Sequence, residues 1–385
     1  MFLNLIFLEI YNVVSYLSLI LAILYVVVVA SFIKGWHRLV PFQYSATQAG
    51  TAVSIIVAAR NEADKIHETI NALLAQDYDK DLTEIIFIDD HSTDDTAAII
   101  SSYGDRGVRL ISLKEDRPLN SYKKKAIQTA IAGASGQLII TTDADCRMGT
   151  KWLKTIVAFY EEKRYKMISS PVAYDEEKSF FERAQSLEFL YLIGLGASTI
   201  GNSKPSTCNG ANLAYEREAF YEVGGFQGID DLASGDDELL LHKIAARYDN
   251  HIGFLKNRDA IVYTHAKPTL SEFLQQRKRW ASKSTRYKNK SIIVLGIFIW
   301  LFNLSILLNL LIGIGLMAYL KVALLQLLLK MAVEFIFLVD VTGFARRKKL
   351  LVLLPLLNIL HVLYIIYIGI AGNSGKYNWK DRMVR

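Results

Sequence analysis

Residues 137–148 read QLIITTDADCRM, an apolar run that ends in two aspartates one residue apart, Asp143 and Asp145. Two carboxylates at this spacing repel each other unless solvent or a cation reduces the repulsion. One interpretation is a turn after a strand, since Asp accepts hydrogen bonds from turn amides. The other is a divalent-cation site, because Mg²⁺ and similar ions prefer carboxylate oxygens. The rest of the chain has to decide between them.

Upstream of this stretch, short apolar runs alternate with helical patterns. Strands are predicted over Thr51–Ala59, Glu84–Ile88, Val108–Ser112 and Gln137–Thr142. Helices are predicted from the spacing of Ile66, Ile70, Leu73 and Leu74, from an N-cap at Ser92 or Thr93, and around Tyr122–Ala132. Continuous apolar strands that alternate with helices are typical of a mainly parallel sheet covered on both faces. We therefore expect an α/β fold.

Acidic residues follow two of these strands. Asp89 and Asp90 come after the second strand, and Asp143 and Asp145 come after the fourth. Ligands of such sheets bind at the carboxyl ends of the strands. Carboxylates there, beside strand-to-helix turns, would suit a nucleotide bridged by a metal. Neither GxGxxG nor GxxxxGK[ST] occurs, so a dinucleotide or P-loop site has no support.

Apolar stretches lie on both sides of this region. Leu17–Ile33 has no charge and no small-residue cleavage site, so we expect a retained membrane helix rather than a signal peptide. Ser291–Leu320 and Leu350–Ala371 are also long enough to span a bilayer. Val322–Val341 is a third C-terminal candidate, with an interfacial position as the alternative. Its residues Lys330 and Glu334 lie four apart, so on a helix they share a face and can pair at membrane depth.

The net charge of +6 is concentrated at the ends of these apolar stretches. The positive-inside rule then places residues 42–290 in the cytoplasm. Membrane topology thus accounts for the basic charge, and no nucleic-acid-binding motif is present. Three C-terminal spans would leave the basic tail outside, so two and three spans both stay open. The two cysteines, Cys146 and Cys208, form no CxxC pair, and no disulfide is expected in a reducing cytoplasm.

Two stretches of the cytoplasmic region carry further candidates, each with a structural alternative. TCNGANLAY, residues 207–215, is a small-residue loop that would let Asn209 and Asn212 approach a ligand, or a plain connection. GDDELL, residues 235–240, would place a general base on the first turn of a helix. Its acids would otherwise only complement the helix dipole.

Two basic stretches are ambiguous in the same way. QQRKRW, residues 275–280, places Gln276, Arg279 and Trp280 on one helix face. That face would meet a diphosphate and a sugar, or would lie at the membrane interface. In the basic run Lys123–Lys125, the first lysine would reach a diphosphate, or the run would be a solvated helix face.

Taken in order, these motifs resemble those of membrane-embedded family 2 glycosyltransferases of the GT-A fold. The resemblance spans roughly Ser54–Trp280 and the flanking apolar segments. Four features carry it: Asp90 within IIFIDDHSTDDT, the DxD motif at 143–145, the base motif Asp236-Asp237, and QxxRW at 276–280. The family's base motif usually reads Glu-Asp, so Asp236 departs from the pattern while the aligned base, Asp237, does not.

The resemblance implies a role for each of these residues. Asp90 would hold the nucleotide base, and Asp145 with Asp143 would hold Mg²⁺ or Mn²⁺ on the diphosphate. Asp237 would be the catalytic base that deprotonates an acceptor hydroxyl. The substrate-binding set that we expect is Arg60, Glu62, Asp90, Lys123, Asp143, Asn209, Asn212, Asp236, Gln276, Arg279 and Trp280.

The resemblance also implies a reaction. With one base and no separate nucleophile, transfer would invert the anomeric configuration. QxxRW with one N-terminal and a few C-terminal spans is similar to ceramide glucosyltransferases and related glycolipid synthases, which implies a lipid acceptor. UDP is the commoner donor nucleotide in the family, with GDP as the alternative. A processive polysaccharide synthase shares QxxRW, and a non-catalytic nucleotide-sugar-binding membrane protein is a further alternative.

These expectations divide the chain into five segments of a bacterial inner-membrane protein. They are an N-terminal transmembrane helix (1–33), a cytoplasmic GT-A domain (49–258), interfacial helices with QxxRW (259–290), C-terminal transmembrane segments (291–372) and a basic tail (373–385). The tail sequence WKDR is similar to the WxGR ending of some glycolipid synthases.

Overall fold

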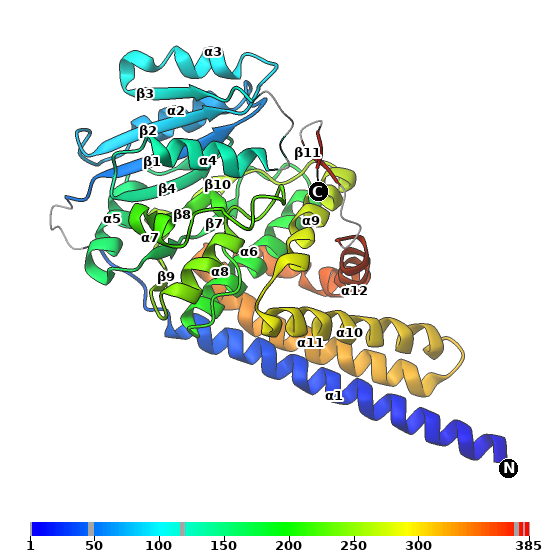
Figure 1. Ribbon diagram of the computed structural model, residues 1–385. Helices are drawn as coiled ribbons and strands as arrows, with labels where there is room; N and C mark the ends of the chain where they lie inside the picture. The colour runs from blue at the N-terminus through cyan, green and yellow to red at the C-terminus, as the bar shows by residue number, and fades with distance from the viewer. Residues whose placement is uncertain are drawn as a thin grey trace. The chain divides into compact units, whose positions relative to one another are not determined.

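The computed structural model describes residues 2–44, 50–115, 119, 121–372, 377–379 and 382–384. Two compact units make up the chain (Figure 1). Gly35–Gln275 form most of an α/β unit, and Met1–Lys34 with Gln276–Ser374 form a helical unit. Most of the expected tail, and the expected domain start at residue 49, lie outside the described residues.

The α/β unit is built on a seven-stranded sheet. Its first four strands are β1 (Val53–Ala59), β2 (Thr83–Asp89), β3 (Val108–Ser112) and β4 (Leu138–Asp143), all parallel, in the order β3-β2-β1-β4. The sheet continues through β8 (Leu213–Glu216), β6 (Met167–Ser169) and β9 (Ile252–Phe254). Only β8 runs against the others. The predicted mainly parallel α/β sheet is confirmed.

Helices cover both faces of this sheet, since successive residues of β1 and β4 are buried in turn on opposite sides. The helices of the unit are α2 (Ile66–Leu74), α3 (Thr96–Ser101), α4 (Tyr122–Ala132), α5 (Trp152–Lys163), α6 (Phe180–Gly201), α7 (Arg217–Glu222) and α8 (Glu238–Arg247). A smaller sheet has the order β5 (Arg147–Met148), β10 (Val262–Thr264) and β7 (Val172–Tyr174). In the C-terminal region β11 (Tyr377–Trp379) pairs with β12 (Arg382–Val384).

The predicted N-cap of α3 is wrong by a few residues. The helix begins at Thr96 with Asp95 at the N-cap, rather than Ser92 or Thr93. The residues before it are used in contacts with the β1–α2 loop: the Ala63 N–H donates to Asp94, and the Asn61 N–H donates to the Ser92 hydroxyl. These tertiary hydrogen bonds hold the preceding residues in a non-helical path.

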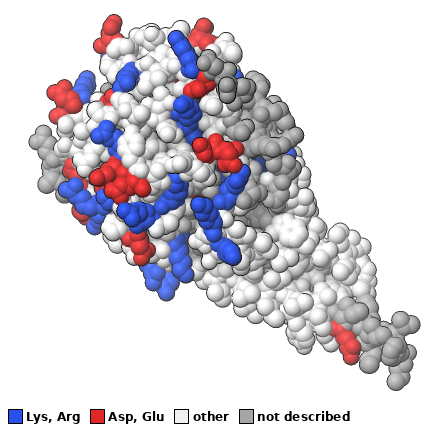
Figure 2. All heavy atoms as spheres, in the orientation of Figure 1, with Lys and Arg blue, Asp and Glu red and all other residues white. Residues whose placement is uncertain are grey.

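The helical unit contains the apolar segments. Four helices are long and apolar enough to span a membrane, over Tyr11–Arg38, Lys290–Gly313, Met317–Phe344 and Lys348–Ala371. They correspond to α1 (Phe2–Arg38), α10 (Lys290–Gly313), α11 (Met317–Phe344) and α12 (Leu354–Ala371) with the 3₁₀ turn before it, while α9 (Leu270–Ser282) carries the QxxRW residues. On the face shown in Figure 2, charged side chains gather over the α/β unit and the helical unit is mostly uncharged.

The uncharged run 291–320 is divided between two helices. The chain turns between Gly313 and Met317, and a Cβ placed at Gly313 would lie 2.8 Å from the Leu320 nitrogen. Glycine therefore permits the close approach of the two helix ends. Because the residues on both sides of the turn are apolar and uncharged, the sequence pattern does not mark it.

Buried polar contacts join helices within this unit. The predicted pair is confirmed: the Lys330 ammonium lies 2.9 Å from the Glu334 carboxylate on α11. Tyr25 of α1 and Asn358 of α12 also donate to Glu334, at 2.5 and 2.9 Å. Pairing of this kind lowers the cost of burying a charge among apolar helices.

Candidate active site

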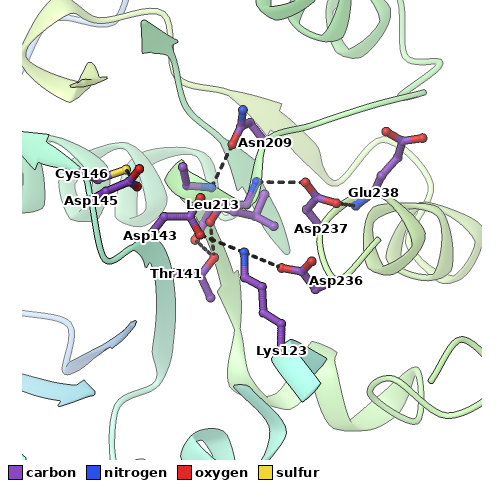
Figure 3. Close-up of polar contacts among 12 residues, drawn as sticks. Lys123, Thr141, Asp143, Asp145, Cys146, Asn209, Leu213, Asp236, Asp237 and Glu238 are labelled. Carbon is purple, nitrogen blue, oxygen red and sulfur yellow. Dashed lines mark hydrogen bonds and ion pairs between the residues drawn. The ribbon is translucent and has the colours of Figure 1, made fainter. Parts of the chain in front are cut away.

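The DxD motif lies where β4 ends. Asp143 is the last residue of β4, and Asp145 lies in the turn before β5, beside the Cys146 thiol (Figure 3). The Thr69 hydroxyl donates to the Ala144 carbonyl oxygen at 2.8 Å and fixes this turn. Both carboxylates are partly exposed. Burial and these two aspartates raise the pKa of the Cys146 thiol well above its ordinary value, so the thiol stays protonated.

The acidic pair opens α8. Asp237 is the N-cap, and its carboxylate accepts from the Glu238 N–H at 2.7 Å and from the Gly210 N–H at 3.1 Å. A Cβ placed at Gly210 would lie 3.3 Å from Asp236 Oδ2 and from the Asp237 Cβ. Glycine therefore keeps the 207–215 loop close to the pair, a contact that the small-residue composition of the loop hinted at. The two stretches that the sequence singled out separately meet here.

Lys123 connects the two carboxylate pairs. Its ammonium, on α4, lies 2.8 Å from Asp143 Oδ1 and 3.2 Å from Asp236 Oδ2 (Figure 3). Burial lowers the pKa of Lys123, but Asp143, Asp236 and Asp237 raise it by more, so the pKa lies above its ordinary value. The ammonium therefore stays charged at physiological pH. The first lysine of the run 123–125 is thus directed into the site.

Asp90 follows β2 and is 2% exposed. Its carboxylate lies 3.0 Å from the His91 Nδ1. The Arg60 guanidinium donates to the carbonyl oxygens of Asp90 and His91, at 2.8 and 2.5 Å. Arg60 therefore fixes the backbone at Asp90, and its contact with substrate stays a prediction. The Glu62 N–H donates to Thr96 in the same pair of loops.

The two asparagines of the 207–215 loop differ in what they can offer a ligand. Asn209 is partly exposed and accepts from the Ala211 N–H at 2.9 Å. Asn212 is fully buried: it donates to the carbonyl oxygens of Pro171 and Ala260 and accepts from the Trp152 indole. Substrate binding by Asn212 stays a prediction. Its side chain holds the loop in place.

The QxxRW residues are partly exposed on α9. The Arg277 guanidinium lies 4.2 Å from the centroid of the Trp280 ring and donates to the Gln276 side chain at 2.7 Å. Arg277 is 2% exposed. It occupies a variable position of the motif, so the sequence pattern did not single it out. Stacking of this kind orients an indole ring.

The DxD carboxylates fit a divalent ion by their chemistry. Among the described residues, no three His, Cys, Asp or Glu side chains are grouped as ligands for a metal. Asp143 and Asp145 nevertheless offer partly exposed carboxylate oxygens, the ligands that Mg²⁺ and Mn²⁺ prefer. An ion held by one or two carboxylates takes its remaining ligands from water and from substrate phosphates.

Comparison with known proteins agrees with this arrangement. Residues 54–224 match the model of glycosyl transferase family 2. The beta-monoglucosyldiacylglycerol synthase of Synechocystis is 25% identical over 232 residues, 60% of this chain and 47% of that protein. The poly-beta-1,6-N-acetyl-D-glucosamine synthase of Staphylococcus aureus is 24% identical over 235 residues, 60% of this chain and 53% of that protein. The chain spans about half the length of these curated relatives.

A solved structure shares the fold over nearly the whole chain. It is a mannosyltransferase from Pyrobaculum calidifontis in complex with GDP-mannose and Mn²⁺, with a TM-score of 0.58 and 19% identity. The match covers 95% of this chain and 98% of that one. Residues 54–224 of this chain are thus similar to glycosyl transferase family 2, and the chain shares the GT-A fold with that mannosyltransferase.

Proposed function

We propose that this protein is a membrane-bound inverting glycosyltransferase that moves a sugar from a nucleotide diphosphate sugar to a lipid or lipid-linked hydroxyl. One observation carries the proposal: Lys123 brings the strand-end pair, Asp143 and Asp145, together with the helix-start pair, Asp236 and Asp237. A group-transfer site needs to stabilise a leaving diphosphate and to activate a neutral hydroxyl. The two pairs supply one task each.

The donor half of the site is formed by Asp143, Asp145, Lys123 and Asp90. Asp145 with Asp143 would hold Mg²⁺ or Mn²⁺, which neutralises charge on the departing diphosphate. The Lys123 ammonium lies beside these carboxylates and would donate to a phosphate oxygen. Asp90, at the end of the neighbouring strand, would accept from the nucleotide base. We propose UDP as the nucleotide, with GDP as the alternative.

The acceptor half is formed by Asp237, with Asp236 beside it. The Asp237 carboxylate would take the proton of the acceptor hydroxyl while that oxygen attacks the anomeric carbon. The bond from that carbon to the diphosphate breaks, and the nucleoside diphosphate leaves with the bonding electron pair. General-base catalysis of this kind contributes ~10² to 10⁴ in rate. A single displacement inverts the anomeric configuration.

The membrane segments are the basis for the lipid acceptor. We propose that the four apolar helices anchor the enzyme in a bacterial inner membrane with the α/β unit in the cytoplasm, as the distribution of positive charge favours. Gln276, Arg279 and Trp280 would close over donor and acceptor. The relative named for glucosyldiacylglycerol synthesis agrees with a lipid acceptor. The relative named for polysaccharide synthesis supports a processive synthase as the second candidate.

Release of nucleoside diphosphate tests the proposal. Purified full-length protein in native lipid extract is assayed with a panel of UDP- and GDP-sugars and Mg²⁺ or Mn²⁺, beside the Asp237→Asn variant. We expect release with one donor, dependent on metal and lost in the variant. Sizing of the labelled product separates the two candidates, as a discrete glycolipid or a ladder. Donor binding without release in the presence of acceptor lipid would contradict catalysis.

A further inference from the structure

The segment that leads into Asp236 and Asp237 has no helix or strand of its own. It runs from Gly224 to Gly235, between α7 and α8, and all of it is described. Both end residues have left-handed backbones, with φ of +69° and +86°. A loop of this length without secondary structure is uncommon and is usually functional. Something other than a ladder of backbone hydrogen bonds has to define its path.

Lys124 fixes the path of this segment. It lies on α4, is 1% exposed, and its ammonium donates to the carbonyl oxygens of Ile229, Leu232 and Ser234 at 2.7, 2.5 and 2.7 Å. A lysine has three N–H donors, and each of these bonds uses one carbonyl of the segment. A buried ammonium is costly unless such partners surround it. The buried charge is therefore satisfied when the segment follows this path.

The segment's end is also tied to α4 by the neighbouring lysine. Lys123 reaches the Asp236 carboxylate at 3.2 Å, and Lys124 holds the Ser234 carbonyl two residues earlier. Consecutive Cα atoms are ~3.8 Å apart, so a fixed Ser234 leaves Asp236 and Asp237 little freedom. Both lysines thus contact the segment from α4. Lys124 binds its backbone carbonyl oxygens, and Lys123 binds the side chain of Asp236.

We propose that Lys124 is a positioning residue that sets the location of the two acidic residues Asp236 and Asp237. This proposal rests on the proposed role of Asp237 as the base. A misplacement of about 1 Å at a reacting group can cost ~10²-fold in rate. Asp143 ends β4 and Asp145 lies in the turn before β5, so both lie outside this segment, and we expect donor binding to change less than turnover. Loss of Lys124 therefore lowers kcat and leaves the KM for the donor nearly unchanged.

Lys243 provides an internal comparison. It reaches the same segment from α8, and its ammonium donates to the carbonyl oxygens of Gly225 and Gln227, at 2.6 and 2.9 Å. These carbonyls lie at the start of the segment, far along the chain from Asp236. Its removal is expected to loosen residues 225–228 with less effect on kcat than removal of Lys124.

The test uses the full-length protein in lipid with the variants Lys124→Ala, Lys124→Met and Lys243→Met. Lys125→Met is the matched control, because Lys125 is an exposed neighbour on α4 that pairs with Glu115 at 3.7 Å. Hydrogen exchange of residues 224–237 is measured beside kcat and KM. We expect faster exchange there in both Lys124 variants, and a fall in kcat of ~10²-fold at constant KM. Ammonium or ethylammonium should restore part of the kcat of Lys124→Ala, at matched ionic strength against sodium.

The exchange measurement keeps this proposal separate from the proposed function. It needs no turnover, so absence of activity in the wild-type protein would contradict the function while exchange still tests the hold of Lys124 on the segment. Lys124→Met retains most of the side-chain volume and separates loss of charge from loss of packing. Unchanged exchange at 224–237 in both Lys124 variants, or wild-type kcat in both, would overturn the proposal.

Discussion

The two carboxylate pairs of the site differ in what holds their oxygens. Both oxygens of Asp237 accept backbone N–H groups, from Glu238 and from Gly210. Asp143 instead pairs with the flexible side chain of Lys123, and 40% of its own side chain is exposed. Asp145 lies beside the Cys146 thiol. The backbone thus fixes Asp237, whereas Asp143, like Asp236, faces the exchangeable side chain of Lys123.

This difference suits the different tasks that we propose for the two pairs. A base has to meet the acceptor hydroxyl at a set distance, so fixing it before the substrate arrives favours the reaction. A metal-binding pair has to admit and release a charged ligand in each cycle. A lysine can move aside from Asp143 for an incoming cation, whereas a helix N-terminus does not leave Asp237. Substitution of single residues can test the two pairs separately.

Among the donor-side residues, the largest effect is expected from Asp145→Asn, which keeps the shape of the side chain and removes its charge. Metal stabilisation of a leaving group is worth several kcal/mol, so kcat/KM should fall by about 10³-fold. Titration of activity with Mn²⁺ measures the change and should show a higher metal requirement. Asp105→Asn, at an exposed position, is the control. Unchanged metal dependence in Asp145→Asn would remove this residue from the metal site.

A smaller effect is expected from Lys123→Met. The variant loses a charge-assisted hydrogen bond to the donor, worth roughly 1.5–3 kcal/mol, so donor affinity should fall by at least about tenfold. Calorimetry with the nucleotide sugar at fixed metal concentration measures this. Lys125→Met, which changes the exposed neighbour, should bind donor as the wild type does. Equal donor affinities in the two variants would mean that Lys123 does not bind the donor and serves only to pair with Asp143 and Asp236.

The smallest effect on activity is expected at Glu84, a carboxylate at the end of the β2 strand that lies away from the candidate site. Glu84, near the start of β2, accepts from the Ser54 hydroxyl at 2.7 Å and from the Ser135 N–H at 3.0 Å. Burial raises its pKa, but these hydrogen bonds and Arg109 lower it by more, so the pKa lies below its ordinary value of 4.5. Its ionised form therefore contributes stability above pH 4.5 that is lost as pH falls through the lowered pKa.

Glu84→Gln should accordingly reduce the free energy of unfolding by about 1 kcal/mol at neutral pH and leave glycosyl transfer unchanged. Thermal unfolding of both proteins across pH measures the difference, which should shrink below pH 4.5. A loss of transfer activity equal to that of the site variants would contradict the division between structural and functional carboxylates.

Features set by periodicity and by strand ends could be predicted from the sequence. Buried strands of continuous apolar residues indicated the parallel sheet, and the same pattern placed Asp90 and Asp143 at strand ends. Helical spacing indicated that Lys330 and Glu334 would pair. The acid run at 236–238 indicated a helix start, and α8 begins there with Asp237 at its N-cap. In each case the relevant forces act between residues close in sequence.

Features set by distant backbone groups could not be predicted. Asn212 looks like any polar loop residue until Pro171 and Ala260 are seen to accept its hydrogen bonds. Lys124 looks like its two neighbours until the 229–234 carbonyls surround it. The start of α3 depends on Ala63 in another loop. Sequence patterns show which groups are polar, but tertiary structure decides which partner satisfies them.

The most direct test of the division of roles is to measure donor binding and turnover on one sample of Asp237→Asn. The substitution keeps one oxygen that can accept a backbone N–H, replaces the other with an amide nitrogen that cannot accept, and removes the proton acceptor. We predict that calorimetry gives wild-type affinity for the nucleotide sugar with metal, while nucleoside diphosphate release in native lipid extract falls by about 10² to 10⁴. Wild-type release by this variant would contradict the account, because the base would then lie elsewhere.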